Sequence, residues 1–270
     1  MTAVPVSARI PLPRASCPAP APGPVESPGS FATSRRTPVD LEVVVPAYNE
    51  AHRLPVTVAA TVEYLSQQPW TSRVVVVDNG SSDDTARVGR SFAGLSTRVP
   101  VEVIGCARPG QGAAVRRGIP TSESRFVGFF DADLATPVAT LSTAMALLDD
   151  GAAAVIASRY APGSILLRRQ PVVRRLGSAL FRRMTHPLVS GITDTQCGFK
   201  FFDRDAVSRA LAQCRTTGFA FDVELLQKIQ ADGGYIVEMP VAWTDDPRST
   251  FRPIPDGVAS FAALVQLRRS

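Results

Sequence analysis

Four short apolar runs, each ending in a polar or glycine-rich loop, constrain the fold of this chain more than any other feature of its sequence. They cover residues 41–46, 74–77, 101–104 and 126–130. Continuous apolar runs of this length predict buried strands and are typical of parallel sheets covered on both faces. The stretches between them have helical periodicity. This alternation predicts the α/β class: a single, Rossmann-like domain with a mostly parallel sheet flanked by helices.

The loops that follow these strands carry the residues that could bind a ligand or take part in catalysis. In an open α/β sheet, ligands bind in the crevice outside the carboxyl ends of the strands. The sequence therefore predicts a nucleotide-binding crevice at one sheet edge. Its candidate residues are Asn49, Glu50, Asp78, Gly110, Gly112, Asp131 and Asp133.

Asp131 and Asp133 are the strongest candidates among these residues, because they directly follow the run at 126–130. Acids two positions apart on an extended chain point in similar directions. Two close carboxylates repel each other unless a cation neutralises them, and Mg²⁺ and Mn²⁺ prefer oxygen ligands. The pair predicts a site for Mg²⁺ or Mn²⁺. The plainer alternative is a solvated turn with incidental acids.

The composition favours a globular protein with anionic partners. Of the 270 residues, 45% are hydrophobic and 20% are charged, and the net charge is +5. Lys200 and Lys228 are the only lysines, so arginine, which binds phosphate in a bidentate manner, supplies nearly all the positive charge. We expect no nucleic-acid partner. The four cysteines lack C-x-x-C spacing, which favours reduced cytosolic thiols.

The ends of the chain and one internal helix differ from this pattern. Residues 1–38 are rich in proline and alanine and predict a disordered tail; residues 39–250 form the predicted domain; residues 251–270 predict a C-terminal amphipathic helix. Residues 172–188 predict an amphipathic helix with a basic face, which suits either a membrane interface or a soluble surface. No apolar run approaches the roughly 18 residues that span a bilayer. We expect a cytoplasmic protein, with peripheral contact at the inner membrane face left open.

Five motifs, taken together, resemble a known enzyme family. VVVPAYNE, VVVVDNGSSDDT, GQGAAVRRG, FFDADLATP and DTQCGFKFF occur in this order over roughly residues 40–250. They are similar to inverting family-2 glycosyltransferases of the GT-A fold, and most similar to the branch that glycosylates dolichyl or polyprenyl phosphate with glucose or mannose. The resemblance implies a metal-dependent hexosyltransferase.

The resemblance also implies a donor site. Asp131 and Asp133 would hold the metal that bridges the diphosphate. The residues implied in nucleotide binding are Pro46, Ala47, Tyr48, Glu50, Asp78, Gly110, Gln111, Asp131 and Ala132. Two positions depart from the family pattern. Asn79 replaces the second acid of an Asp-Asp pair, which affects ribose or base contacts, and Gln111 replaces a lysine, for which Arg108 or Arg116 could substitute.

On the acceptor side, the resemblance implies two sets of residues. The catalytic set is Asp131, Asp133, Asp194 and Asp222, with Glu224 as a further acid near Asp222. The set for the acceptor or its phosphate is Arg159, Arg174, Arg175, Lys200 and Arg248. For Lys200 and Asp194, two interpretations stay open: a structural ion pair with each other, or a place in the sugar and acceptor pocket.

The nature of the acceptor decides whether the reaction needs a base. A phosphate monoester is already largely ionised at neutral pH, since its second pKa is near 6, whereas a hydroxyl needs a carboxylate within about 3 Å. We favour transfer of glucose from UDP-glucose to a polyprenyl (dolichyl-type) phosphate. Transfer to a soluble small molecule is the main alternative. A nucleotidyltransferase and a non-catalytic nucleotide-binding protein are the others.

Overall fold

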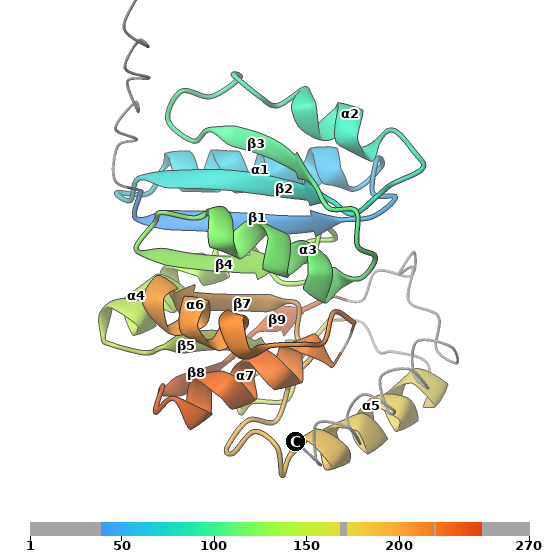
Figure 1. Ribbon diagram of the computed structural model, residues 1–270, viewed down its shortest axis with the longest axis vertical. Coiled ribbons are helices and arrows are strands. Elements are labelled where there is room, and N and C mark those ends of the chain that lie inside the picture. The colour runs from blue at the N-terminus through green and yellow to red at the C-terminus, as the bar shows by residue number, and fades with distance from the viewer. Residues whose placement is uncertain (1–38, 168–171, 219, 245–270) are drawn as a thin grey trace, which may run out of the picture. The chain divides into compact units, whose positions relative to one another are not determined.

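A seven-stranded, mostly parallel sheet forms the centre of the protein (Figure 1). The computed structural model describes residues 39–167, 172–218 and 220–244. The strand order is β3-β2-β1-β4-β7-β5-β8, and only the pairs that involve β7 are antiparallel. These strands are β1 (Leu41–Ala47), β2 (Ser72–Asp78), β3 (Val101–Gly105), β4 (Phe126–Phe130), β5 (Ala154–Ser158), β7 (Phe199–Asp203) and β8 (Ile236–Pro240). The predicted α/β class is confirmed.

Helices cover both faces of this sheet, as the continuous apolar strands predict. On one face lie α1 (Leu54–Ser66), α2 (Thr85–Arg90) and α4 (Thr140–Asp149); on the other lie α3 (Gln111–Gly118), α6 (Arg204–Gln213) and α7 (Phe221–Ala231). A short turn of 3-10 helix, η1 (Ile119–Thr121), follows α3. The helix α5 (Val172–Thr185) lies beyond the sheet in Figure 1. A small parallel pair, β6 (Ile165–Leu166) and β9 (Ala242–Trp243), stands apart from the main sheet.

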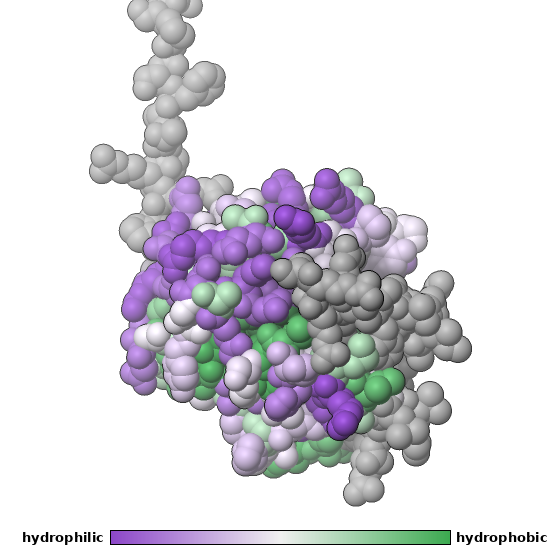
Figure 2. Space-filling view, turned by 60° about the horizontal axis from the view of Figure 1, so that its bottom comes forward, coloured by the Kyte–Doolittle hydropathy of each residue, from purple (hydrophilic) through white to green (hydrophobic). Residues whose placement is uncertain are grey.

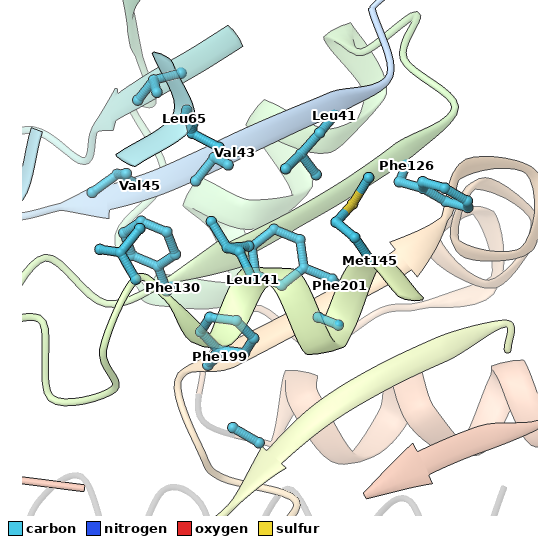
Figure 3. Packing of buried hydrophobic residues seen from close by; sticks show 14 of the residues in the cluster. Leu41, Val43, Val45, Leu65, Phe126, Phe130, Leu141, Met145, Phe199 and Phe201 are labelled. Carbon is cyan, nitrogen blue, oxygen red and sulfur yellow. The ribbon is translucent and has the colours of Figure 1, made fainter. Parts of the chain in front are cut away.

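The core on the α4 face is built from aromatic side chains of β4 and β7. Phe199 and Phe201 lie with their ring centroids 4.8 Å apart, and Phe130 lies 6.2 Å from Phe199. Leu141 and Met145 of α4 pack over these rings (Figure 3). Burial of large apolar side chains stabilises a fold by about 1.5–3 kcal/mol each. This cluster therefore fixes the ends of β4 and β7 next to each other.

The strand β7 is the feature that the sequence pattern does not predict. Its residues Phe199–Asp203 include Lys200, which interrupts the apolar run. The strand enters the sheet between β4 and β5, antiparallel to both. Its side chains alternate between the two faces, so that Phe199 and Phe201 meet α4 while Lys200 and Phe202 point toward α7.

Predicted helix ends are also confirmed where glycine is required. Gly110, with φ of 109°, precedes α3, and Gly151, with φ of 96°, follows α4. Both conformations suit glycine because it has no Cβ. The predicted tail at 1–38 and the C-terminal helix at 251–270 lie outside the described residues. Within the described part of the chain, no helix has the length and apolar character needed to span a bilayer.

Candidate active site

The loops after β1, β2 and β4 meet at one edge of the sheet, as the parallel topology requires. In the register of the sheet, Ala47 is opposite Asp78, and the Asn79 amide donates to the Ala47 carbonyl at 2.8 Å. Tyr48 follows with half of its surface (52%) exposed. Asp131 begins the loop after β4. The structure thus brings the predicted nucleotide and metal residues to a common edge.

The aspartate pair lies beside a small hollow of about 10 Å³. Its lining residues are Phe130, Asp131, Asp133, Ala135, Thr136, Gly198 and Trp243. The Asp131 amide donates to the Gly198 carbonyl at 2.9 Å. A Cβ at position 198 would lie 1.8 Å from Asp131 Oδ2, so only glycine leaves room for this carboxyl group. Gly198 therefore belongs to the site through its lack of a side chain, as its predicted role in close backbone approach requires.

The two carboxylates carry unfavourable electrostatics when no cation is near. Burial raises the pKa of Asp131 to about 7, the charge of Asp133 adds to the effect, and Lys200 opposes it. A divalent cation would remove this penalty, because its charge favours the ionised form of both groups. Two neighbouring carboxylates, one of them with a raised pKa, fit a hard cation such as Mg²⁺ or Mn²⁺.

A cation at this pair would need ligands from outside the protein. No group of three or more His, Cys, Asp or Glu side chains is placed to hold a metal in the part of the chain that the structure describes. One Asp133 oxygen already accepts a hydrogen bond from the Ala135 amide at 3.0 Å. Mg²⁺ commonly takes one or two carboxylates and completes its shell with water and substrate phosphates. The geometry suits a metal that is shared with a diphosphate.

Gln111 contacts the aspartate pair directly. Its Nε2 donates to Asp131 Oδ1 at 2.7 Å, so the residue that replaces the family's lysine orients one candidate metal ligand. Of the two suggested substitute cations, Arg116 donates to the Cys214 carbonyl at 2.7 Å and serves the fold, while Arg108 is exposed. Arg108 is the one that stays available for a diphosphate.

Asn79 holds the loop that carries Gln111. Its side-chain nitrogen donates to the carbonyls of Cys106 and Arg108, and its side-chain oxygen accepts from the Gly110 amide at 2.8 Å. An aspartate could accept from Gly110 but could not donate to the two carbonyls. Sequence reasoning assigned the Asn79 departure to ribose or base contacts and missed this bridging role. The asparagine itself was the signal, because its amide offers both a donor and an acceptor whereas an ionised aspartate only accepts.

The remaining residues predicted to bind the nucleotide differ in their hydrogen-bond partners and in their burial. Glu50 forms an ion pair with Arg53, and its amide donates to Thr85 Oγ1 at 2.7 Å. Asp78 Oδ1 accepts from the Ser81 amide at 3.2 Å. The side chains of Ala47 and Ala132 are buried, and Pro46 and Gly110 are partly exposed. Neither alanine therefore presents its side chain to a ligand.

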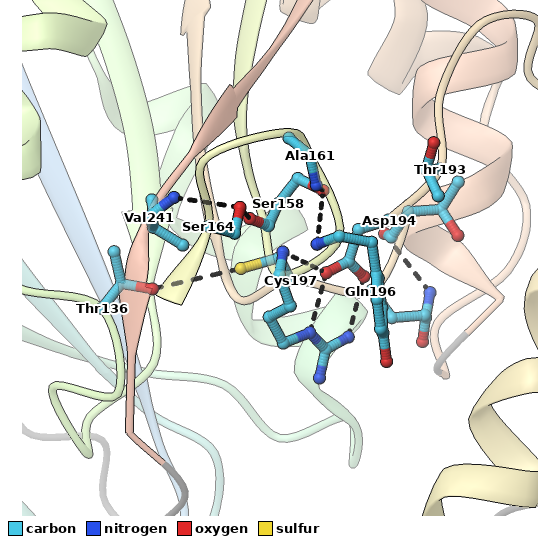
Figure 4. A network of polar contacts seen from close by, with 12 residues as sticks. Thr136, Ser158, Ala161, Ser164, Thr193, Asp194, Gln196, Cys197 and Val241 are labelled. Carbon is cyan, nitrogen blue, oxygen red and sulfur yellow. Dashed lines mark hydrogen bonds and ion pairs between the residues drawn. The ribbon is translucent and has the colours of Figure 1, made fainter. Parts of the chain in front are cut away.

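The ion pair considered between Lys200 and Asp194 is not formed, and each residue has another partner. Asp194 binds Arg159, whose Nε lies 2.7 Å from Oδ2 and whose second nitrogen lies 2.8 Å from Oδ1 (Figure 4). Lys200 Nζ lies 2.9 Å from Asp222 Oδ1. The alternation along β7 explains the difference, because it directs Lys200 to the face where α7 packs.

Each of the three acids near the acceptor side, Asp194, Asp222 and Glu224, has partners within the protein. Burial acts to raise the pKa of Asp194, but the Arg159 guanidinium outweighs it and holds the pKa below its ordinary value. Burial raises the pKa of Asp222 in spite of Lys200. Glu224 accepts hydrogen bonds from the amides of Arg215 and Thr216 at 2.9 and 2.8 Å. All three acids are therefore engaged within the protein.

Three predicted acceptor residues are not placed at the site by the structure. Arg174 and Arg175 lie on α5, whose first turns have no described side chains, and Arg248 lies outside the described residues. Arg159 and Lys200 are placed, but as members of buried ion pairs; Lys200 has no exposed surface.

Comparison with known proteins decides the family. The model of glycosyl transferase family 2 matches residues 42–211. The chain belongs to glycosyl transferase family 2. It is therefore a glycosyltransferase, and the expectation drawn from the five motifs is confirmed. The matched segment runs from β1 to α6 and includes both aspartates of the hollow.

Relatives of this family 2 enzyme include dolichyl-phosphate β-glucosyltransferases. The human protein of that name is 35% identical over 229 residues, which cover 79% of this chain and 70% of the relative. The protein from Dictyostelium discoideum is 29% identical over 248 residues, covering 86% of this chain and 76% of the relative. The branch predicted from the motifs is thus represented among its relatives.

Solved structures confirm the GT-A fold. Glucosyl-3-phosphoglycerate synthase from Mycobacterium tuberculosis in complex with UDP superposes with a TM-score of 0.62 at 19% identity, covering 85% of this chain and 80% of that one. The same synthase with Mn²⁺, UDP and glucosyl-3-phosphoglycerate gives a TM-score of 0.61 at 18% identity, with the same coverage. At this identity the likeness concerns the fold alone.

Proposed function

We propose that this glycosyltransferase moves glucose from UDP-glucose to a polyprenyl (dolichyl-type) phosphate, with inversion at the sugar carbon. The observation that carries the proposal is the Asp131–Asp133 pair, enclosed against Gly198 at the carboxyl edge of the sheet. The names of the 35% and 29% identical relatives support the choice of sugar and acceptor. The catalytic domain would span residues 39–250.

Asp131 and Asp133 would hold Mg²⁺ or Mn²⁺, which when bound supplies positive charge to the departing diphosphate. Gln111 keeps Asp131 oriented through its 2.7 Å hydrogen bond, and Asn79 keeps the loop of Gln111 in place. Tyr48 and Asp78 lie at the same edge, where they would contact the nucleotide. Preorganised groups of this kind stabilise developing charge without reorganising during the reaction.

The acids on the acceptor side support a phosphate acceptor over a hydroxyl. A general base must be free to take a proton from the nucleophile. Asp194 is bound by Arg159, Asp222 by Lys200, and Glu224 by two backbone amides. An acceptor phosphate is already ionised and needs no such base. We therefore propose positioning roles for Asp194 and Asp222 in place of proton transfer.

Contact with a membrane surface would bring the enzyme to a lipid acceptor. Apolar side chains of the β6 segment and α5 stay exposed: Ile165, Leu166, Leu167 and Leu180. The face in Figure 2 carries hydrophobic surface next to strongly hydrophilic surface. Such mixed surfaces suit reversible contact with a bilayer. We propose a cytoplasmic enzyme that binds peripherally to the inner membrane face.

The test is to supply Mn²⁺ and a panel of nucleotide sugars with and without polyprenyl phosphate, and to measure release of nucleoside diphosphate. Release from UDP-glucose that requires the lipid phosphate supports the proposal. Release that ignores the lipid but responds to a soluble alcohol would replace it with the second candidate, a small-molecule glycosyltransferase.

Variants of the acidic pair test the metal site within the same assay. Asp131→Ala should lower turnover by about a hundredfold or more, because loss of one charge-stabilising group typically costs that much. Asp150→Ala is the matched control, since Asp150 is an exposed aspartate outside the site. Unchanged turnover in Asp131→Ala would refute the metal assignment.

A further inference from the structure

The helix α1 contacts the loop of the aspartate pair through a buried side chain, Thr57. The Thr57 hydroxyl donates to the Ala132 carbonyl at 2.6 Å. Ala132 is the residue between Asp131 and Asp133, and its carbonyl belongs to the peptide group that joins it to Asp133. Neither the family assignment nor the proposed donor site gives Thr57 a role.

The Thr57 hydroxyl serves this loop in preference to its own helix. A threonine inside a helix often donates to the carbonyl four residues earlier. Thr61, one turn further along α1, does so, with its Oγ1 2.7 Å from the Thr57 carbonyl. The corresponding partner of Thr57 is the Arg53 carbonyl at 3.2 Å, which is farther away than the Ala132 carbonyl. A hydroxyl has one hydrogen to donate, so Thr57 donates to the loop.

Both ends of this hydrogen bond are buried. Thr57 and Ala132 have almost no exposed surface. Among the described residues, no backbone amide donates to the Ala132 carbonyl. A buried carbonyl that loses its donor costs free energy, which favours rotation of its peptide group toward water or another donor. The Thr57 hydroxyl therefore stabilises one orientation of the peptide group between Ala132 and Asp133.

The loop that Thr57 contacts has a strained backbone. Leu134, directly after Asp133, has φ of 53°, in the left-handed region that a bulky residue rarely adopts. Such a conformation persists where the surrounding contacts determine it. Within the loop, an Asp133 oxygen accepts from the Ala135 amide at 3.0 Å. The Thr57 hydroxyl adds a contact from the α1 side, just before the strained residue.

The start of α1 also supports the loop after β1. The amides of Arg53 and Leu54 donate to the Glu50 carbonyl at 3.0 and 2.8 Å. Thr57 follows within the first turns of the same helix. One helix therefore contacts both the loop that we assign to the nucleotide and the loop of the aspartate pair.

We propose that Thr57 is a positioning residue for glycosyl transfer, which keeps Asp131 and Asp133 directed at one cation by fixing the Ala132 carbonyl. This inference rests on the proposed function, in which the pair holds Mg²⁺ or Mn²⁺. Rotation of the peptide group after Ala132 would change the direction of Asp133 relative to Asp131. Groups that orient metal ligands from behind typically affect metal affinity or activity by about 10–100-fold.

Hydrogen–deuterium exchange of the full-length protein, without metal or nucleotide, measures the loop directly. Thr57→Val keeps the shape of the side chain and removes the hydroxyl, whereas Thr57→Ser keeps the hydroxyl. Thr61→Val is the matched control, because it removes a buried hydroxyl that donates within the same helix. Exchange of the amides in the loop 131–135 should accelerate about tenfold in Thr57→Val, since loss of a buried hydrogen bond shifts local opening by roughly this factor. Thr57→Ser and Thr61→Val should exchange like the wild type.

Metal affinity is the second readout. Mn²⁺ is titrated in the presence of saturating UDP and followed by electron paramagnetic resonance. Thr57→Val should weaken Mn²⁺ binding about tenfold or more, while Thr57→Ser and Thr61→Val keep the wild-type affinity. The Mn²⁺ concentration that gives half-maximal turnover of UDP-glucose should rise by the same factor. If Thr57→Val does not fold, Thr57→Ala replaces it with the same expectation.

The outcomes separate this inference from the proposed function. Unchanged loop exchange or unchanged Mn²⁺ affinity in the variant without the hydroxyl would overturn the inference, while Mn²⁺-dependent transfer by the wild type leaves the function standing. Effects of the same size in Thr61→Val or Thr57→Ser would also overturn it, because they would not depend on the hydroxyl that reaches the loop. A wild type that transfers no glucose refutes the proposed function, and loop exchange and Mn²⁺ affinity still decide the inference because neither requires turnover.

Discussion

Substitution of Gly198 by alanine should separate catalysis from folding in this enzyme. An added Cβ would lie 1.8 Å from Asp131 Oδ2, whereas real Cβ contacts are essentially never below 3.0 Å. The carboxyl group or the backbone must therefore shift by about 1.2 Å, the difference between these two distances. The backbone of Gly198 has no positive φ, so alanine brings no conformational strain of its own.

A shift of this size acts on one metal-binding carboxylate. Misplacement of a reacting or binding group by about 1 Å can cost a hundredfold in rate, or about 2.7 kcal/mol of transition-state stabilisation. We expect Gly198→Ala to lower kcat/KM for UDP-glucose about a hundredfold and to weaken Mn²⁺ binding. Overpacking should lower the free energy of unfolding by only about 1–3 kcal/mol.

The assay is release of UDP under saturating polyprenyl phosphate, together with Mn²⁺ titration followed by electron paramagnetic resonance. Gly105→Ala serves as the control, because nothing lies within 4 Å of a Cβ at that position. Urea unfolding of both variants shows whether they remain folded under assay conditions. If folded Gly198→Ala kept kcat/KM within threefold of the wild type, the carboxyl position would not depend on Gly198 and the reasoning would be wrong.

Three further predictions concern the buried polar groups. Lys200→Met should lower the free energy of unfolding by about 3–5 kcal/mol, because it leaves Asp222 buried without a counter-charge. The double variant Lys200→Met/Asp222→Leu should recover most of this loss, as measured by urea denaturation. Since Arg159 keeps the pKa of Asp194 low, the stabilisation from this pair should be complete above about pH 4 and be lost as the pH falls through the lower folded-state pKa. The stability difference between the wild type and Asp194→Asn, measured by urea unfolding from pH 7 to pH 3, should therefore shrink at the acid end; a difference that grows there contradicts the sign. Asn79→Asp removes the hydrogen bonds that the Asn79 side chain donates to two backbone carbonyls. It should lower the free energy of unfolding by about 1–3 kcal/mol and raise KM for UDP-glucose. An unchanged KM in steady-state kinetics would refute the role of Asn79 in holding the loop.

Sequence patterns were sufficient for the part of the fold that is local. The apolar runs at β1, β2, β3 and β4 are continuous, and such runs are stable only between two layers of helices. The glycines before α3 and after α4 have positive φ, which follows from a local requirement of the backbone. Because the carboxyl ends of parallel strands share an edge, the position of Asp131 and Asp133 at the same edge as Asp78 also followed from order along the chain.

The partners of the buried charges could not be predicted in the same way. Lys200 and Asp194 lie six positions apart, and sequence distance made them natural candidates for each other. In the fold, Arg159 reaches Asp194 from the end of β5, and Asp222 reaches Lys200 from α7. Ion pairing depends on the face of the sheet to which each side chain points. For Lys200 that face is known only once β7 is placed in the sheet.

The sequence by itself determined the alternating architecture, the edge at which the acids gather and the residue types that suit a hard cation. Only the tertiary structure placed β7 antiparallel between β4 and β5, and thereby set Gly198 against Asp131. The physical reason is that hydrophobic periodicity is a local property of the chain. Strand order and the pairing of buried charges depend on contacts between segments far apart in sequence, which packing alone decides.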